Sequence, residues 1–302
     1  MDASSFIIGL TLNFRDAART HRCLQSLLAE GACRVLVWDN SEDGGTSARA
    51  LRAALGAEKR VSIEVSPVNL GFAAGVNRGI DWIVQRHPGA CVLLINNDAH
   101  LLPGAVAAMR RALVHNAEAR IAYPDIDHSG KTIGTVYYQR WFGLRSTRPL
   151  PGSYAYASGC CLLLDPVRTG PAVFDEDFFM YGEDEELGCR MSRMPGTLLH
   201  VPGTWVRHEG SASGRIGSPF YEERTVAAHL ILARKLARNS AEASGLLLGR
   251  VLMLPARAVV RALRQRSFIP LRALAHGWGL AQGRDPLLQK TRGFAAQHTY
   301  QG

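Results

Sequence analysis

An apolar run in the first third of the chain ends abruptly in three polar residues. Cys91–Ile95 are all apolar, and Asn96, Asn97 and Asp98 follow at once. Such a run predicts a strand buried on both faces, and open α/β sheets bind ligands at the C-terminal ends of their strands. Asp98 could hold a divalent cation that holds a diphosphate, and the amides could hydrogen-bond a sugar or phosphate. A polar turn before a helix explains the same residues.

Polar residues also end the first two predicted strands. Thr11 and Asn13 close the first, and Asp39 closes the second. The two strands would lie side by side in a doubly wound sheet. Asp39 could then accept the imide N–H of uracil or thymine, or a ribose hydroxyl. An Asx turn at residues 39–41 is the alternative.

A glycine-rich string occupies residues 69–79. It opens with Asn69, and from Gly71 onward every fourth residue is glycine, so the backbone could approach a phosphate or a neighbouring strand closely. Asn77 and Arg78 add polar groups near a predicted helix N-terminus, where anions bind. The string lacks the G-x-G-x-x-G pattern, which disfavours a dinucleotide-binding fold. A glycine-softened turn explains the glycines alone.

Acidic and aromatic residues alternate over residues 174–186. Glu183 and Asp184 would open a helix, whose dipole should stabilise their negative charge and keep them ionised, as a general base requires. The flanking aromatic residues suit a sugar site. Acids that merely decorate a helix start are the alternative.

A histidine follows a predicted strand further along the chain. His208 could ligate the same metal as Asp98 or bind a phosphate oxygen, although a single histidine is more often structural. Arg207 and Arg215 could neutralise diphosphate charge. The Gly/Ser-rich residues 210–214 suggest a lid.

Elements that could position these residues alternate along the first 116 residues. This β-α-β-α rhythm predicts a mostly parallel sheet with helices on both faces. Residues 123–153 predict loops and short strands that could line an acceptor cleft. Strands are predicted at residues 6–12, 35–38, 61–65, 91–95, 154–164 and 197–201, and helices at residues 16–30, 46–55, 75–86, 102–116, 183–194 and from 220 onward with breaks at Pro255 and Pro270.

The totals describe an ordinary globular chain. It has 302 residues, 47% of them hydrophobic, and a formal net charge of +9. Six cysteines without a C-x-x-C pair predict reduced, packed thiols rather than a zinc site. No export signal and no run of 18 apolar residues is present, so we expect a cytoplasmic protein.

Arginine is concentrated near the C-terminus. Residues 244–284 hold seven arginines and no acid, interleaved with Leu, Val and Ala. A basic amphipathic helix of this kind could lie on an anionic membrane surface, which would make the protein peripheral on the inner face of the cell membrane. A helix that packs its apolar side inward and leaves the arginines in water is the alternative.

The ordered set of motifs resembles the glycosyltransferase family 2 proteins, in particular the bacterial rhamnosyltransferase-like branch. The resemblance covers roughly residues 6–240. It is carried by Thr11-Leu12-Asn13, Val37-Trp38-Asp39-Asn40-Ser41, Asn69-Leu70-Gly71-Phe72, Asn77-Arg78-Gly79, Asn96-Asn97-Asp98, Phe174-Asp175-Glu176-Asp177-Phe178-Phe179, Glu183-Asp184 and His208.

The resemblance implies a Rossmann-like GT-A fold, a nucleotide-sugar donor and a divalent cation, Mg²⁺ or Mn²⁺. It makes Asp184, beside Glu183, the acceptor-activating base, and it places Asp98 and His208 at the metal. Asn96 departs from the family, which has a first Asp in a full D-x-D. The donor-binding candidates are Thr11, Asn13, Asp39, Asn69, Gly71, Asn77, Arg78, Asn96, Asn97 and Arg207.

The implied organisation is a GT-A catalytic domain over residues 1–218 and a helical region over residues 219–302. The donor half would span about 1–120 and the acceptor half about 121–218. The implied activity is inverting transfer of a sugar, with rhamnose from dTDP-rhamnose as the first choice and other dTDP- or UDP-sugars open. The acceptor would be a glycan or a lipid-linked glycan in cell-surface polysaccharide synthesis, such as O-antigen assembly.

Two other classes compete with this interpretation. A sugar-nucleotide pyrophosphorylase should carry a glycine-rich, lysine-bearing loop after the first strand, and residues 13–16 contain neither. A non-catalytic basic protein could bind nucleic acid, but the acids at 175–186 would repel phosphates and the arginines accompany apolar runs rather than aromatic residues. We therefore expect no nucleic-acid partner.

Overall fold

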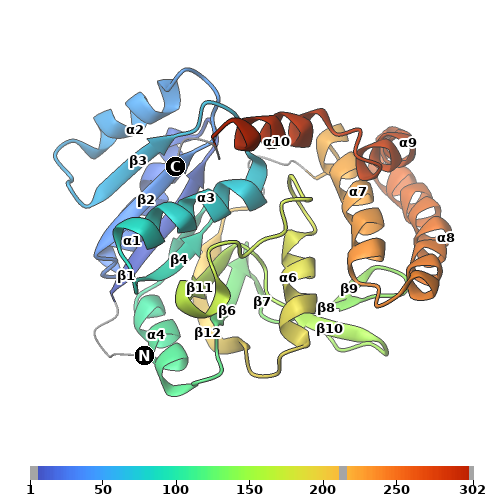
Figure 1. The fold of residues 1–302 in the computed structure, drawn as a ribbon, viewed down its shortest axis with the longest axis horizontal. Coiled ribbons are helices and arrows are strands. Elements are labelled where there is room, and N and C mark those ends of the chain that lie inside the picture. Colours follow the sequence, from blue (N-terminus) through green and yellow to red (C-terminus); the bar gives the residue numbers. More distant parts are fainter. Residues whose placement is uncertain (1–5, 211–215, 299–302) are drawn as a thin grey trace.

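The apolar run Cys91–Ile95 forms strand β4 at the centre of the main sheet in the computed structural model, which describes residues 6–210 and 216–298 (Figure 1). Its side chains alternate between two cores. Cys91, Leu93 and Ile95 join one core, whereas Val92 and Leu94 join the other. Because both faces are covered, every position must be apolar. The predicted doubly buried strand is confirmed.

Twelve strands are present in the described residues, nine of them in one sheet. The main sheet has the order β3-β2-β1-β4-β11-β6-β12-β5, with β7 beside β6, and a second sheet has the order β10-β8-β9. The strands are β1 (Ile7–Asn13), β2 (Arg34–Asp39), β3 (Val61–Val65), β4 (Cys91–Ile95), β5 (Ala99–Leu101), β6 (Ile121–His128), β7 (Lys131–Ile133), β8 (Val136–Gln139), β9 (Leu144–Ser146), β10 (Ser153–Tyr156), β11 (Cys161–Leu164) and β12 (Leu198–His208).

The main sheet changes character at β11. Strands β3, β2, β1 and β4 run parallel, as the β-α-β rhythm predicts. β11 lies antiparallel between β4 and β6, while β6 and β12 are again parallel to each other. This arrangement places the C-terminal end of β12 beside short β5, which follows β4 directly in the chain.

Helices cover both faces of the sheet. α1, α2 and α4 pack on one face, and α3 and α6 pack on the other. The predicted α/β fold with a helical C-terminal extension is confirmed. The helices are α1 (Ala17–Ala29), α2 (Thr46–Leu55), α3 (Gly71–Arg86), α4 (Ala105–His115), α5 (Pro166–Thr169), α6 (Glu183–Ser192), α7 (Pro219–Lys235), α8 (Ser240–Gln265), α9 (Ile269–Ala281) and α10 (Pro286–His298).

The recurring glycines of α3 serve packing on the sheet. A Cβ on Gly75 would lie 2.7 Å from the Asn40 side chain, and one on Gly79 would lie 2.6 Å from Leu10. Both distances are too short for real atoms, so any larger residue would have to displace the Asn40 or Leu10 side chain where α3 packs on β1 and the loop after β2. The expected close contact with a neighbouring strand is therefore confirmed for Gly75 and Gly79.

Several predicted boundaries are wrong, among them the strand predicted at residues 154–164, which is the two strands β10 and β11; three others have an identifiable cause. α3 begins at Gly71 rather than at 75, because the Asn69 side chain accepts from the Gly71 N–H at 2.9 Å. β12 continues to His208 instead of ending at 201, since a bulge near Gly203 restores its pairing with β6. α8 passes through Pro255 unbroken, held by its packing against α7 and α9.

The structure bears on two further predictions, the packing of the cysteines and the lack of a membrane-spanning helix. All six cysteines are free, and five are buried. Cys33 is exposed, so the prediction of packed thiols is wrong for that residue. Within residues 6–210 and 216–298, no helix is both long and apolar enough to cross a bilayer.

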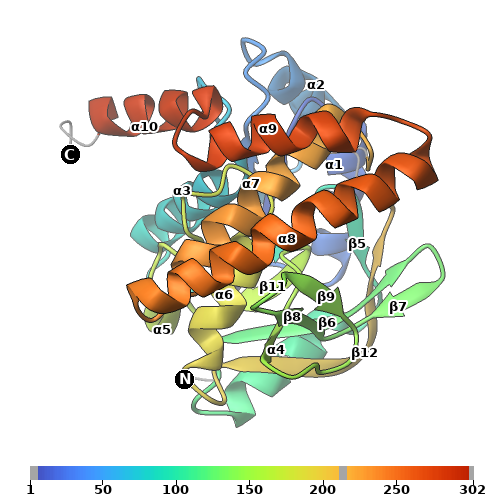
Figure 2. The same cartoon turned by 90° about the vertical axis from the view of Figure 1, so that its right-hand side faces the viewer.

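A fully buried arginine joins the C-terminal helices to the second sheet. Arg250 of α8 donates to the carbonyl oxygens of Trp141 and Arg140, each at 2.7 Å, and also reaches the Tyr138 hydroxyl at 3.2 Å. Figure 2 shows α8 crossing over β8 and β9. The guanidinium therefore satisfies main-chain carbonyls that face the helix at the turn after β8.

Replacing this arginine should destabilise the protein. Arg250→Met should lower the free energy of unfolding by about 3 kcal/mol, because the carbonyls it satisfies would stay buried without donors. Urea unfolding followed by circular dichroism measures the change. Arg264→Met, at an exposed position near the end of the same helix, is the matched control and should change stability by less than about 0.5 kcal/mol. Equal losses for the two variants would contradict the role assigned to Arg250.

Candidate active site

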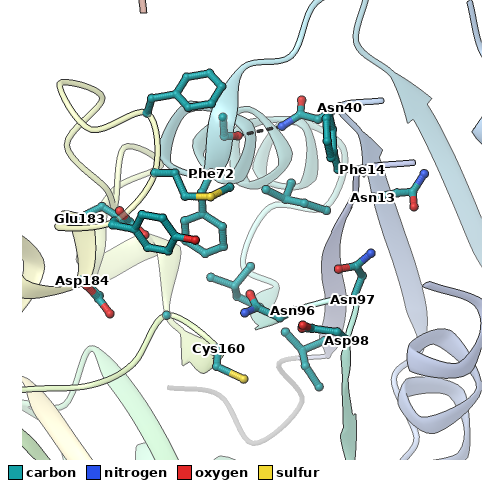
Figure 3. Close-up of a pocket in the computed structure, with 18 of the residues that line it drawn as sticks. Asn13, Phe14, Asn40, Phe72, Asn96, Asn97, Asp98, Cys160, Glu183 and Asp184 are labelled. Carbon is teal, nitrogen blue, oxygen red and sulfur yellow. Dashed lines mark hydrogen bonds between the residues drawn. The ribbon is translucent and has the colours of Figure 1, made fainter. Parts of the chain in front are cut away.

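A cavity of about 500 Å³ opens at the C-terminal ends of β1 and β4 (Figure 3). The N-termini of α3 and α6 reach its wall, and this volume is within the usual range for small-molecule sites. In Figure 3 the carboxylates of α6 lie on one side of the cavity and the asparagines that follow the strands lie on the other. Nine of the sequence-predicted residues line it: Asn13, Asn69, Gly71, Asn96, Asn97, Asp98, Glu183, Asp184 and His208.

Five other candidates lie outside this lining, in different surroundings. Thr11 and Asp39 are fully buried beneath it. Asn77 is buried in α3, where its side chain donates to the Phe174 carbonyl and accepts from the Phe174 N–H. Arg78 is partly exposed on α3. Arg207 is exposed on β12 and lies 3.6 Å from the Asp127 carboxylate.

Asp39 makes the predicted Asx turn and keeps one oxygen unused. Its Oδ1 accepts from the Ser41 N–H at 3.1 Å and from Asn13 Nδ2 at 2.9 Å. Its Oδ2 is buried and has no hydrogen-bond partner. Because native proteins seldom leave a buried carboxylate oxygen unpaired, this atom is a candidate acceptor for a ligand N–H.

The pairing of β12 with β5 brings His208 to Asp98. His208 pairs with Ala99 in the sheet, and its Nε2 lies 3.0 Å from Asp98 Oδ1. On the other side of the ring, His208 Nδ1 lies 3.0 Å from His128 Nδ1. Burial and the neighbouring His208 lower the pKa of His128, which favours its neutral form. His208 Nδ1–H can then donate to His128, which would leave the Nε2 lone pair for a cation.

The charge of the lining suits a bound divalent cation. Three carboxylates, Asp98, Glu183 and Asp184, line the cavity, whereas no lysine or arginine does so within the described part of the chain. A diphosphate would meet these carboxylates without a positive partner. Asp98 and His208 supply one oxygen and one nitrogen ligand, and a cation held by them could complete its coordination with phosphate and water oxygens.

This donor set is small. Among residues 6–210 and 216–298, no group of three or more His, Cys, Asp and Glu side chains is placed to hold a metal ion by itself. The residues therefore fit a cation that depends on its substrate for further ligands. Arg215 and the Gly/Ser-rich lid expected at 210–214 lie outside the described residues, apart from Gly210.

The carboxylates of α6 are crowded at the start of the helix. Gly182, with φ 99°, precedes α6, and Glu183, Asp184 and Glu185 follow in succession. Glu183 and Glu185 are buried, while Asp184 keeps part of its surface open to the cavity. Arg145 of β9 donates to Glu185 Oε1 at 2.5 Å. Arg145 thus pairs with Glu185, the one carboxylate of these three that does not line the cavity.

Burial overrides the helix dipole at these acids. Burial raises the pKa of Glu183 to about 8, and burial together with the adjacent Glu185 raises the pKa of Asp184 well above its usual range. Burial also opposes ionisation of Glu185, but Arg145 outweighs it and lowers the pKa of that group. A helix terminus contributes only about 0.3–1 kcal/mol. The prediction that the dipole keeps Glu183 and Asp184 ionised is therefore wrong for the unliganded protein.

Several lining residues escaped sequence reasoning. Leu287 reaches the cavity from α10, and Asp285, which precedes that helix, is held by an ion pair with Arg224 of α7. Tyr181 lines the wall with φ 69°, a left-handed conformation that is uncommon outside glycine. No local sequence pattern indicates that Leu287 reaches the cavity. The Tyr181-Gly182 pair before the acidic start of α6, in contrast, does indicate an unusual turn.

Comparison with known sequences decides the family. The sequence profile described as Glycosyl transferase family 2 matches residues 10–166, which is just over half of the chain. The chain belongs to glycosyl transferase family 2. The matched region holds the end of β1, all of β2 and the Asn96-Asn97-Asp98 motif, and the α6 carboxylates and His208 follow it.

Curated relatives of this glycosyltransferase occur in Mycobacterium tuberculosis. Proteins of the strains CDC 1551 / Oshkosh and ATCC 25618 / H37Rv, named N-acetylglucosaminyl-diphospho-decaprenol L-rhamnosyltransferase, are each 26% identical to it over 227 residues. The alignment covers 63% of this chain and 71% of the relative.

Solved structures show the same GT-A fold. GalNAc-T7 with UDP, GalNAc and Mn²⁺ superposes with a TM-score of 0.57 and 13% identity, over 76% of this chain and 48% of that one. This glycosyltransferase thus spans about half the length of that protein. S. aureus TarS 1-349 in complex with UDP-GlcNAc gives a TM-score of 0.55 and 13% identity, over 95% of this chain and 87% of that one.

The raised pKa values predict an alkaline activity profile. A base must be deprotonated to act, so the kcat/KM of the glycosyltransferase should rise by about tenfold per pH unit below the raised pKa of Asp184, instead of being constant above the ordinary range of a carboxylic acid. Steady-state kinetics from pH 5 to pH 9 measures the profile. A rate that is already constant from pH 5 upward would contradict the raised pKa values.

A variant of Arg145 tests the cause of this profile. The Arg145 guanidinium lowers the pKa of both Glu183 and Asp184, so Arg145→Gln should shift the rise to higher pH. Arg145→Lys, which keeps the positive charge, is the matched control and should restore most of the original profile.

Proposed function

We propose that this protein is an inverting glycosyltransferase that moves a sugar from a nucleoside-diphosphate donor to an acceptor hydroxyl. The single observation that carries the proposal is the convergence of the family 2 motifs on one cavity. Asp98 and His208 lie on one wall, and Glu183 and Asp184 lie on another. A diphosphate and an acceptor hydroxyl could thus bind next to each other with the sugar between them.

Asp184 is the proposed general base. It is more accessible to the cavity than Glu183, whose Oε2 is buried and unpaired. Deprotonated Asp184 would take the proton of the acceptor hydroxyl as its oxygen forms a bond to the anomeric carbon. The bond from that carbon to the diphosphate oxygen breaks in the same step, and the nucleoside diphosphate leaves with the electron pair. One such displacement inverts the anomeric centre and requires no covalent enzyme intermediate.

The opposite wall would hold the donor. We propose that the unpaired Asp39 Oδ2, which is buried beneath the lining rather than in it, accepts the imide N–H of the base when the donor binds, with Asn13 and Asn69 of the lining beside it. Asn96 and Asn97 would hydrogen-bond the ribose, sugar or diphosphate. Four other predicted donor residues do not line the cavity: Thr11, Asn77, Arg78 and Arg207. We propose that they support or flank this wall instead of contacting the donor.

We also propose metal dependence. Asp98 and His208 would hold Mg²⁺ or Mn²⁺, and when bound the cation would offset the charge that grows on the leaving diphosphate. The absence of lysine and arginine from the described lining supports this proposal, because Asp98 and the diphosphate would otherwise repel each other.

For the substrates, we propose rhamnosyl transfer from dTDP-rhamnose to a lipid-linked glycan in cell-surface polysaccharide synthesis. It is supported by the mycobacterial relatives, which are named as rhamnosyltransferases that act on a lipid-linked sugar. A UDP-sugar is the alternative donor, since TarS was solved with UDP-GlcNAc. We retain the proposed division into residues 1–218 for catalysis and 219–302 for the helical region. Leu287 of the helical region nevertheless lines the cavity.

Product analysis tests the function directly. The purified protein with Mn²⁺, an N-acetylglucosaminyl-diphospho-lipid acceptor and dTDP-rhamnose should release dTDP, and the product should carry the anomeric configuration opposite to that of the donor. Luminescent detection of nucleoside diphosphate and NMR of the product measure both. UDP-sugars serve as the alternative donors.

Chelation provides the control for the cation. EDTA should stop dTDP release, and added Mn²⁺ or Mg²⁺ should restore it. Release of pyrophosphate instead of dTDP would indicate a sugar-nucleotide pyrophosphorylase. Release of neither compound with any donor or acceptor in the panel would favour a non-catalytic binding protein.

Removing the proposed base should separate chemistry from binding. Asp184→Asn should lower kcat by about 10²–10⁴-fold, because the amide cannot accept the acceptor proton. Calorimetry should show dTDP affinity within about twofold of the wild-type value, since Asp184 faces the acceptor side. Asp81→Asn on the exposed part of α3 is the matched carboxylate control and should keep full activity. Unchanged turnover of Asp184→Asn would remove this residue from the role of base.

A further inference from the structure

The exposed side of α8 is entirely apolar along most of the helix. From residue 245 to residue 263, every exposed position carries an apolar side chain. The exposed fractions are 60% for Leu252 and 74% for Leu263, so these side chains extend well into solvent. We call these positions the outer face of α8: Leu248, Val251, Leu252, Pro255, Ala256, Val259, Val260 and Leu263.

Three arginines of the same helix, Arg250, Arg257 and Arg261, point the other way, whereas Arg264 near its end is exposed. Arg250 is fully buried against main-chain carbonyls, and Arg257 donates to His229 Nε2 at 2.7 Å. Arg261 forms an ion pair with the buried Glu222 of α7. The sequence suggested that the arginines face either a bilayer or water. In the structure these three arginines face the protein, and the apolar side chains face outward.

Apolar side chains of neighbouring elements extend the outer face. Trp141 and Phe142, in the turn after β8, are 41% and 44% exposed. Arg250 and Gly249 bring this turn against α8, since a Cβ on Gly249 would lie 2.1 Å from the Trp141 carbonyl oxygen. Phe268, just beyond the C-terminus of α8, is 74% exposed. In Figure 2 α8 crosses the face turned to the viewer, and no described element lies in front of it.

The shape of the outer face suits a lipid surface. Leu248 and Leu263 are separated by about 22 Å along the helix, at 1.5 Å per residue. A single helix with one continuous apolar stripe can lie in a lipid monolayer by immersing that stripe.

The charges at the end of the outer face favour anionic lipid. Arg264, Arg266 and Arg272 are exposed around the C-terminus of α8 and on the adjoining α9. No acidic residue occurs between Ser244 and Arg284. Exposed tryptophan beside an apolar stripe, with arginine at its edge, matches the chemistry of the boundary between headgroups and acyl chains.

We propose that the outer face of α8 and the turn after β8 dock on an anionic lipid surface, with the apolar side chains immersed and the arginines among the headgroups. This surface is separate from the cavity, and the inference does not depend on the identity of the donor. It gives the proposed lipid-linked acceptor a physical setting, because a protein docked in this way works where such an acceptor is anchored.

Vesicle binding tests the proposal on the full chain. The wild-type protein should co-sediment with vesicles of phosphatidylcholine and phosphatidylglycerol, and more weakly with phosphatidylcholine alone. Leu252→Glu/Val259→Glu should lower the bound-to-free ratio by about tenfold or more, because two charges would enter the immersed stripe. Val167→Glu is the matched control, since Val167 is 78% exposed on α5 and should tolerate the change without loss of vesicle binding.

Three results would overturn the proposal. One is wild-type protein that stays in the supernatant, and another is equal binding of the wild type and the double variant. The third is a wild-type dimer in sedimentation velocity that the double variant dissociates, which would assign the outer face to a second copy. The wild type and the double variant should release dTDP at the same rate with a water-soluble acceptor. If the wild type releases no dTDP in this assay, the result counts against the proposed function and not against the docking surface.

Discussion

The ladder between β5 and β12 is the interaction on which the site depends. It places His208 at 3.0 Å from Asp98, although 110 residues separate them in the chain. The ladder exists because β11 is inserted antiparallel after β4, which lets β6 and β12 extend the sheet beyond the parallel strands β3, β2, β1 and β4. The Gly203 bulge then lets β12 continue to His208. Backbone pairing rather than side-chain contact therefore assembles the proposed cation site.

Electrostatic imbalance is the second organising feature. The cavity collects three carboxylates without a lysine or arginine in the described lining, and the one nearby guanidinium, Arg145, pairs with Glu185 instead. Burial makes Glu183 and Asp184 hold their protons more tightly than free carboxylic acids do. A divalent cation at the proposed Asp98–His208 site would favour the ionised forms of these two acids. Substrate with its cation would thus change the ionisation of the acids as well as occupy the space between them.

The C-terminal helices reverse a common expectation about amphipathic helices. Arginine normally lies in water because desolvating its charge is costly, yet Arg250 is buried and Leu252 two residues later is 60% exposed. The burial is possible because the turn after β8 presents main-chain carbonyls to the guanidinium. Because Arg250, Arg257 and Arg261 are held by the rest of the protein, α8 carries only apolar side chains on its outer face.

The sequence by itself determined the parallel half of the fold and the motif residues, because apolar periodicity and polar strand ends are local signals. It placed β4 and α2 correctly and named nine residues of the cavity lining. Only the tertiary structure decided the rest. The pairing of β11 and β12, the direction of Arg250 and the reach of Leu287 all depend on segments distant in the chain. The ionisation of Glu183 was decided in the same way, since burial is a property of the packed protein and the helix dipole that the sequence suggested is the weaker effect.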